Sequence, residues 1–234
     1  MLNLPQTGGA AVAPPIAPVP GAPGNGAQGD AAAAAAASVI EAGRILAARG
    51  WVPATSGNLS ARIDADHIAV TASGIDKGSL TPAHILTIAL AEPPPKGSSA
   101  ETGLHQIAYR RDPSINAVLH VHSRSATLIS RRIGHGGADD AAVRLRGYEL
   151  LKAFATVRTH ATEIAVPIFA NDQDIDALAE RVAARLPSFG PTPGFLIEGH
   201  GLYAWGRTMA EAHRHLEAFD FLFTCELAQI GVPA

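Results

Sequence analysis

Two histidines separated by a single valine, His120 and His122 in "NAVLHVHSRS", are the residues best placed to do chemistry. The apolar, partly β-branched residues around them predict a buried strand. Side chains at i and i+2 of a strand project from the same face, so both imidazoles should point the same way. This spacing predicts either part of a metal site or two packed core histidines that bond to backbone carbonyls.

A third histidine, His200, lies in "IEGHGLYAWG" between two apolar segments. The glycines on both sides allow a close approach of the backbone to a ligand. Three imidazoles can hold a catalytic zinc ion and leave positions open for a substrate. The chain has ten histidines and one cysteine, Cys225. We therefore expect imidazole and carboxylate ligands for any transition metal.

Two polar loops could bind an anion. The segments "TSGNLS" (55–60) and "TASGIDKG" (71–78) combine hydroxyls and glycines, and the second also carries a lysine. Loops of this composition expose backbone N–H groups that can surround a phosphate. For each loop taken alone, ordinary turn chemistry is the alternative.

The remaining histidines have simpler explanations. His105 follows Glu101 by four residues on one helix face, which predicts a hydrogen bond on the helix surface. His213 and His215 are two apart in a helical segment, so they point to different faces and cannot share a metal.

The segments between these residues alternate between helix and strand, as in a layered α/β domain. Helices are expected over about 32–49, 100–111, 125–131 and 208–229 and in "DIDALAERVAARL", and "RGYELLKAFATV" has helical character. Strands are expected in "NLSARI", "HIAVT", "ILTI", "EIAVPIF" and on both sides of His200. "GHGGADD" is expected to be a flexible connection. Residues 1–36 are expected to be a disordered Ala/Pro/Gly-rich tail, and residues 37–234 a single domain.

The composition argues against several classes of partner. A formal net charge of −3 gives no basic field for nucleic acid. No uninterrupted run reaches the roughly 18 apolar residues of a membrane span, and the N-terminus lacks the basic region of a signal peptide. We therefore expect a cytoplasmic protein that binds neither nucleic acid nor membrane.

The segments "SGNLS", "TASG", "SAETGLHQIAYRRDPSINAVLHVHS" and "GHGLYAWG" together resemble the zinc-dependent class II aldolase family, which includes sugar-phosphate aldolases and epimerases. The resemblance spans about residues 50–206. It implies a three-layer α/β/α sandwich with a central mixed, largely antiparallel sheet. It also implies a small sugar-phosphate substrate and a homo-oligomer, usually a cyclic tetramer with active sites near subunit boundaries.

The resemblance also implies a set of site residues. One Zn²⁺ per subunit would be held by His120, His122 and His200. The substrate phosphate would be held by Gly57, Asn58, Ser73, Gly74 and Ser99.

The proton chemistry has two candidates by the same resemblance. In the aldolases a glutamate at the start of the helix before the H-x-H strand handles protons, and Glu101 occupies that position. In the dehydratases of the family, which "TASGIDKG", "GYELLKAF", "PIFANDQDI" and "HGLYAWGRT" resemble more closely, the acid/base matches Glu149. We expect Glu149 to carry the proton chemistry of a dehydratase, with Glu101 beside metal and substrate.

Two alternatives to a dehydratase remain at this point: a sugar-phosphate aldolase or epimerase, and a zinc-containing scaffold without activity. The apolar end of a substrate could contact Phe154, Tyr203 or Trp205, although aromatic residues at such positions are more often simply core.

Overall fold

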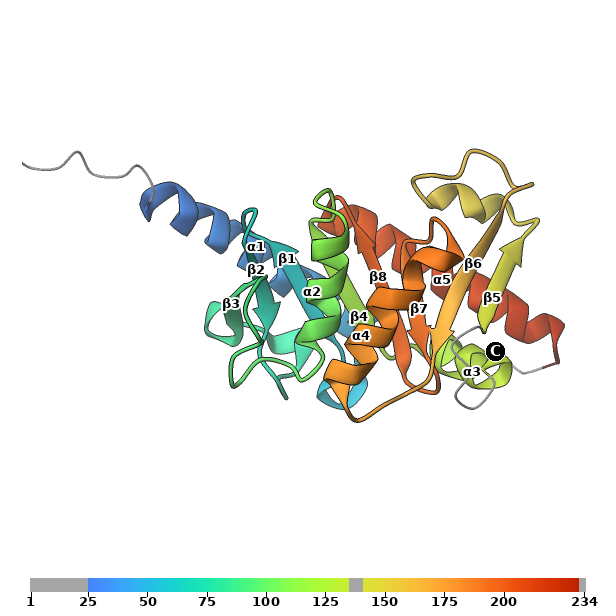
Figure 1. The fold of residues 1–234 in the computed structure, drawn as a ribbon, viewed down its shortest axis with the longest axis horizontal. Coiled ribbons are helices and arrows are strands. Elements are labelled where there is room, and N and C mark those ends of the chain that lie inside the picture. The colour runs from blue at the N-terminus through green and yellow to red at the C-terminus, as the bar shows by residue number, and fades with distance from the viewer. Residues whose placement is uncertain (1–24, 135–140, 232–234) are drawn as a thin grey trace, which may run out of the picture.

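The computed structural model describes residues 25–134 and 141–231, with the side chains from residue 28 onward. In these ranges helices cover both faces of one eight-stranded sheet (Figure 1). The strands are β1 Asn58–Arg62, β2 His67–Thr71, β3 Ile85–Ala89, β4 Ala117–Val121, β5 Ala142–Arg146, β6 Glu163–Phe169, β7 Gly194–Ile197 and β8 Gly201–Gly206. The α-helices are α1 Asn25–Ala48, α2 Thr102–Arg111, α3 Arg124–Ile133, α4 Ile175–Arg185 and α5 Met209–Gln229. Short 3₁₀ helices are η1 Pro53–Thr55, η2 Lys77–Ser79, η3 Pro82–His84, η4 Glu149–Ala153 and η5 Leu186–Phe189.

The strand order is β3-β2-β1-β4-β8-β7-β6-β5. All neighbouring pairs are antiparallel except β6 and β7, which are parallel. The predicted mixed, largely antiparallel sheet is therefore confirmed.

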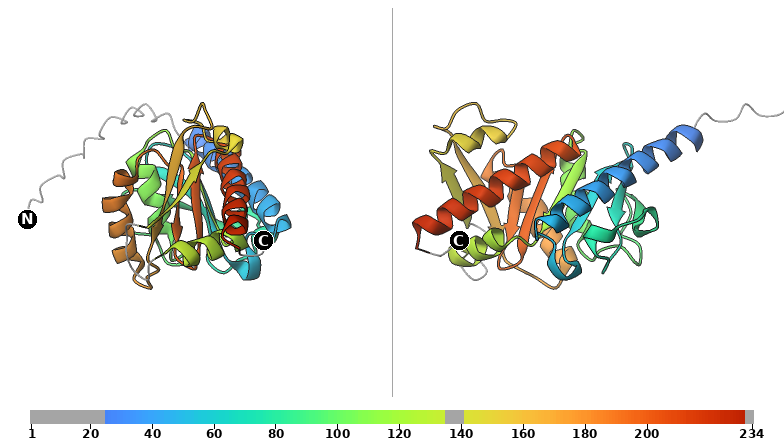
Figure 2. Two further views of the ribbon diagram at one scale, coloured as in Figure 1. Left: turned by 90° about the vertical axis from the view of Figure 1, so that its right-hand side faces the viewer. Right: turned by 180° about the vertical axis from the view of Figure 1, so that it is seen from behind.

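The helices form two outer layers, as the view along the sheet in Figure 2 shows. Helices α1, α3 and α5 contribute apolar residues to one core cluster, and α2 and α4 contribute to a second cluster. The sheet separates the two clusters because side chains alternate between its faces. The α/β/α sandwich expected from the sequence is confirmed.

Strand β4 shows how this alternation positions the H-x-H pair. Leu119 and Val121 belong to the core under α1, α3 and α5, whereas Val118 belongs to the core under α2 and α4. His120 and His122 have the parity of Val118, so they face the α2 side of the sheet. The predicted buried strand and the common direction of its two imidazoles are both confirmed.

The N-terminal helix differs from expectation. Residues 1–24 of the expected tail lie outside the described residues, but residues 25–36 form the first half of α1. Alanine has the highest helix propensity, and Val39 and Leu46 anchor the helix in the core. By length and composition alone, Gln28–Ala48 could also cross a membrane, a test that core helices of soluble proteins also pass, and a third of it is buried in the fold.

The segment after α3 also differs from the structure expected from the sequence. Strand β5 was not predicted, although it alternates buried Val143 and Leu145 with exposed arginines. The helix expected in "RGYELLKAFATV" is only the five-residue η4. Most of the "GHGGADD" connection lies outside the described residues.

Candidate metal centre and anion cavity

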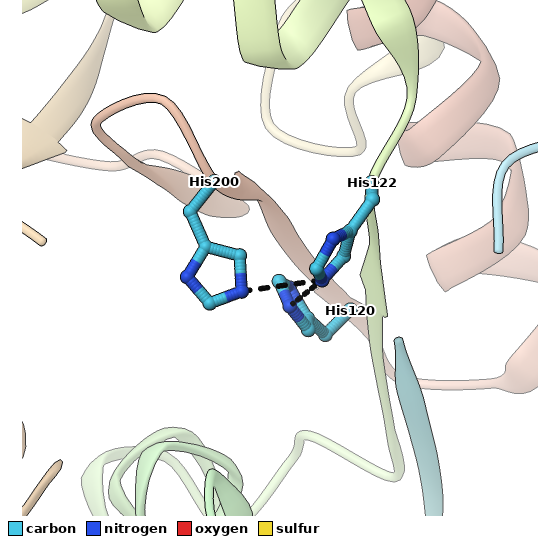
Figure 3. A group of neighbouring side chains, drawn as sticks. All are labelled: His120, His122 and His200. Carbon is cyan, nitrogen blue, oxygen red and sulfur yellow. Dashed lines mark hydrogen bonds between the residues drawn. The ribbon is translucent and has the colours of Figure 1, made fainter. Parts of the chain in front are cut away.

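The three predicted histidines converge at the end of the sheet where β4 stops and β8 starts (Figure 3). The Nε2 atoms of His120 and His122 lie 3.0 Å apart, and those of His122 and His200 lie 3.2 Å apart. His120 is fully buried, while the other two are partly accessible. An open side of the cluster is therefore available to a ligand.

This donor set fits a tetrahedral cation. Zinc–nitrogen bonds of 2.0–2.1 Å place tetrahedral ligands about 3.3 Å from one another, close to the two separations given above, and all three ligand atoms lie within 4.8 Å of one another. Burial lowers the pKa of His120 well below its usual value and that of His122 to about 4, so both are neutral and keep a lone pair. His120 Nδ1 can donate to the Leu202 carbonyl, 3.2 Å away, which leaves Nε2 as the ligand atom.

The close contact of β4 with the start of β8 depends on glycine. Val121 pairs with Leu202 across the two strands. A Cβ atom at Gly201 would overlap the Val121 carbonyl and lie 2.9 Å from His120 Cε1. Gly201 therefore lets the His200 turn approach the H-x-H pair, whereas the sequence predicted that the flanking glycines serve the approach of a ligand.

Glu101 lies directly against the triad. Its Oε1 is 2.9 Å from His200 Nε2 and its Oε2 is 3.3 Å from His120 Nε2. Burial raises the pKa of Glu101, but His120, His200 and a hydrogen bond from Asn58 outweigh this, so the pKa lies below its ordinary value. An ionised carboxylate thus forms one wall of the site.

Asn58 orients that carboxylate. Its Nδ2 donates to Glu101 Oε2 at 2.7 Å and to Ser99 Oγ at 2.9 Å. Because both amide hydrogens are used in this way, the Asn58 oxygen must accept, and it does so from His105 Nε2. Both amide hydrogens of Asn58 therefore bind oxygen atoms of the protein itself, those of Glu101 and Ser99, in this arrangement.

His105 is part of the interior, so its prediction as a helix-surface residue is wrong. It is fully buried, and burial lowers its pKa to about 4. With its proton on Nε2, its Nδ1 accepts from Ser60 Oγ at 2.7 Å, and Ser60 in turn accepts from Tyr109 at 2.9 Å. Residues 104–109 of α2 are all buried, a signal that the Glu101 spacing alone did not reveal.

A cavity of about 170 Å³ adjoins the triad. It brings together the whole set predicted to hold a phosphate, with Glu101 and His122: Gly57, Asn58, Ser73, Gly74 and Ser99. Its other lining residues, Thr55, Ser56 and Ala72, also belong to the two polar loops that the sequence indicated as anion-binding candidates. Gly57 has φ +73°, and a Cβ there would lie 2.6 Å from the His120 carbonyl oxygen, so this loop packs directly on β4.

Glu149 lies elsewhere. Its helix η4 contacts α5, where Arg214 Nε donates to the Ala153 carbonyl, at the end of the sheet opposite the triad (Figure 1). The Glu149 side chain is 72% exposed, bonds to Lys152 and lies 3.7 Å from His160. The Lys152 hydrogen bond lowers its pKa. Within one chain the structure does not bring Glu149 to the triad.

The three aromatic residues considered for the apolar end of a substrate are buried in the core. Tyr203 stacks on the His120 ring with a centroid separation of 4.0 Å, and so helps to hold this imidazole in its orientation. Phe154 packs on Phe219, and Trp205 lines a cavity at the opposite end of the sheet. None of the three lines the described cavity beside the triad.

Known proteins are similar to this chain in sequence and in fold. Residues 37–227 match the profile of the class II aldolase and adducin N-terminal domain. A methylthioribulose-1-phosphate dehydratase of Bradyrhizobium sp. (strain BTAi1) is 54% identical over 191 residues, covering 80% of this chain and 87% of the relative. One from Marinobacter nauticus is 51% identical over 197 residues, covering 83% and 93%.

Solved structures of other proteins have a similar fold. An L-fuculose-1-phosphate aldolase from Thermus thermophilus is 27% identical with a TM-score of 0.66, covering 85% of this chain and 96% of that one. YgbL from Escherichia coli, at 21% identity, has the same fold with a TM-score of 0.69, covering 85% and 90%. The chain belongs to the class II aldolase and adducin family.

Proposed function

We propose that the protein dehydrates 5-methylthioribulose 1-phosphate to 2,3-diketo-5-methylthiopentyl 1-phosphate, a step of methionine salvage, with one Zn²⁺ per subunit. The observation that carries this proposal is the junction of three histidines, an ionised carboxylate and a small cavity of glycines and hydroxyls. The two relatives named as this dehydratase support the choice of substrate.

The substrate would lie across the cavity and the triad. The loops around Gly57 and Gly74 bind its phosphate through hydroxyls and backbone N–H groups. A zinc ion held by His120, His122 and His200 would polarise the C2 carbonyl and make the C3 proton acidic. Glu101, fixed by Asn58, orients the C3 hydroxyl.

The proton transfers are assigned to Glu149. Its carboxylate takes the proton from C3 and delivers a proton to the C4 hydroxyl, which leaves as water. The enol that remains between C3 and C4 then converts to the 3-ketone. Atoms balance, since one water is lost and the glutamate returns to its ionised form.

Because Glu149 is exposed and far from its own triad, it would act in the site of a second copy of the chain. The surface beside it supports such an interface. A groove of about 900 Å³ runs along η4 and α5, and Leu150 and Phe221 on it are 38% and 56% exposed. We propose a homo-oligomer, a tetramer by family resemblance, of single-domain cytoplasmic subunits spanning residues 37–234.

The decisive experiment incubates the zinc-loaded protein with 5-methylthioribulose 1-phosphate and identifies the product by mass. Loss of one water establishes the dehydratase. Cleavage into two carbon fragments would instead identify an aldolase. No conversion with zinc bound would mean that the substrate is wrong.

The shared site is tested by mixing two inactive variants, His120→Ala and Glu149→Gln, in one oligomer. A site that combines intact histidines from one chain with Glu149 of another should regain activity at about a quarter of the sites of a randomly mixed ring. A mixture of His120→Ala with His122→Ala is the matched control and should stay inactive. Failure of the first mixture to recover activity would reject the action of Glu149 across subunits.

A sugar-phosphate aldolase or epimerase is the second candidate, favoured by one observation. Glu101, the position that handles protons in the aldolases, is the carboxylate that lies at the triad of the same chain. The mass experiment separates the two activities.

A further inference from the structure

Lys77 is a buried cation beside the cavity. It is only 1% exposed, and its Nζ donates to the Thr55 carbonyl at 2.8 Å and the Ile75 carbonyl at 2.6 Å. A lysine is almost never fully buried unless it is paired. Among the ion pairs of the described residues, none joins this ammonium to a carboxylate. Burial lowers its pKa, and the nearby charge of Asp76 offsets this only in part.

The backbone holds Lys77 in this position from two sides. A Cβ at Gly43 of α1 would overlap the Lys77 carbonyl and lie 2.8 Å from Leu80 Cδ1, so α1 packs directly on η2. Asp76 caps η2 by accepting from the Gly78 N–H at 3.1 Å. With its backbone fixed in this way, the lysine side chain reaches between two loops.

Those two loops are the walls of the cavity. Thr55 lines the cavity directly, and Ile75 directly follows the lining residues Ser73 and Gly74. The ammonium therefore joins the loop before β1 to the loop after β2.

Apart from the zinc ion proposed for the adjoining triad, the cavity lacks a cation suited to a phosphate. In the described parts of the chain no lysine or arginine lines it, and the carboxylate of Glu101 does. Hydroxyls and backbone N–H groups can bind a phosphate, but a dianion beside a carboxylate gains from a nearby fixed positive charge. Lys77 is the buried cation that directly joins the two walls.

We propose that the Lys77 ammonium is a specificity-determining and positioning residue that makes this cavity selective for a phosphate dianion while it holds both binding loops in place. It does so from behind the loops, without direct contact with the substrate. This proposal rests on the proposed function, since it assigns the cavity to the phosphate of the substrate. It accounts for a buried lysine that forms no ion pair with a carboxylate among the described residues and is only partly compensated by the nearby Asp76.

The first test is a calorimetric titration of the zinc-loaded protein with inorganic phosphate at constant ionic strength. Lys77→Met should weaken phosphate binding at least about tenfold, and Lys77→Arg should retain most of it because the charge remains. Lys96→Met removes an exposed lysine and is the control for net charge; its affinity should match the wild type. If Lys77→Met does not fold, Lys77→Gln, which keeps a neutral donor for the carbonyls, replaces it.

The second test separates charge from loop anchoring. Turnover of the phosphorylated substrate is compared with turnover of the same sugar without phosphate. Lys77→Met should raise KM for the phosphorylated substrate and reduce the preference for it about tenfold, with kcat changed less. An equal loss for both sugars would indicate only loop anchoring and overturn the proposal.

The two proposals can fail separately. If the protein does not dehydrate the sugar phosphate yet binds inorganic phosphate in a Lys77-dependent way, the substrate is wrong and the role of Lys77 stands. If the wild type binds no phosphate, or Lys77→Met binds it as tightly, the role of Lys77 is rejected whatever the enzyme catalyses.

Discussion

The two ends of the sheet carry glutamates in opposite situations. At the triad end, Glu101 is 14% exposed and is fixed by Asn58, His120 and His200. At the other end, Glu149 is 72% exposed and pairs with the flexible side chain of Lys152. The Glu101 carboxylate is enclosed by partners from its own chain, whereas the Glu149 carboxylate is exposed on the surface.

This difference shows what one chain can and cannot assemble. The histidines, Glu101 and the cavity walls are positioned by strands and a helix start whose packing is internal to the fold. Glu149 has no such environment, so a catalytic role for it requires another molecule to cover it. The resemblance to dehydratases and the geometry of one chain thus point to different carboxylates, and the proposed subunit interface would reconcile them.

The largest expected effect is at the triad end. His120→Ala or His122→Ala should abolish zinc binding and, with it, activity by at least about three orders of magnitude, because two imidazoles do not complete a catalytic zinc site. Metal content by mass spectrometry and kcat/KM are measured together. His84→Ala, a histidine outside the cluster, is the control and should keep its zinc. An active variant that lacks zinc would overturn the whole site.

The next effect compares the two glutamates directly. Glu149→Gln should keep zinc but lower the dehydration rate by about two orders of magnitude or more, the usual scale of acid–base catalysis. Glu101→Gln should also weaken zinc binding, because Glu101 contacts two of the ligands. Normal turnover by Glu149→Gln would move the proton transfer to Glu101 or to water.

A smaller effect concerns the buried network behind Glu101. His105 has a pKa of about 4 in the fold and about 6.5 when unfolded, so the unfolded chain binds more protons between these values. Its contribution of about 3 kcal/mol is therefore complete above pH 6.5 and is lost as the pH falls toward 4. Denaturant unfolding from pH 4 to 7 should be flatter for His105→Gln than for the wild type; equal slopes would contradict the buried neutral state.

The smallest effect concerns Asp64, a partly exposed carboxylate that serves as a comparison for the buried network. Asp64 follows β1 at the end away from the triad, where it accepts from Gln28 at 3.0 Å and lies 2.9 Å from His67. The backbone N–H of Asp66 is the main cause that lowers its pKa to about 2, so its stabilisation is present above pH 4 and is lost as the pH falls through 2. Because a third of the side chain is exposed, Asp64→Asn should cost less than about 1 kcal/mol at pH 7. A larger loss in urea unfolding would show that exposed ion pairs matter as much as the buried network.

Periodicity and resemblance predicted much of the site. The two-residue spacing placed His120 and His122 on one face, and the resemblance added His200 to them. The sequence could not show that His105 would be enclosed, because its environment comes from Asn58 and Ser60 on β1, more than 40 residues away. It also could not show that Glu149 and the triad would lie at opposite ends, since this depends on the opposite directions in which β4 and β5 run in the sheet.

The pairing of β4 with β8 has a consequence for how the protein folds. It joins a sheet half built from β1–β4 to one built from β5–β8, and His122 and His200 lie on opposite sides of that seam, 78 residues apart. A nascent chain that has folded only its first half holds two of the three histidines and cannot complete the set. Metal capture is thus tied to long-range loop closure, and ion binding favours the state in which both halves have met.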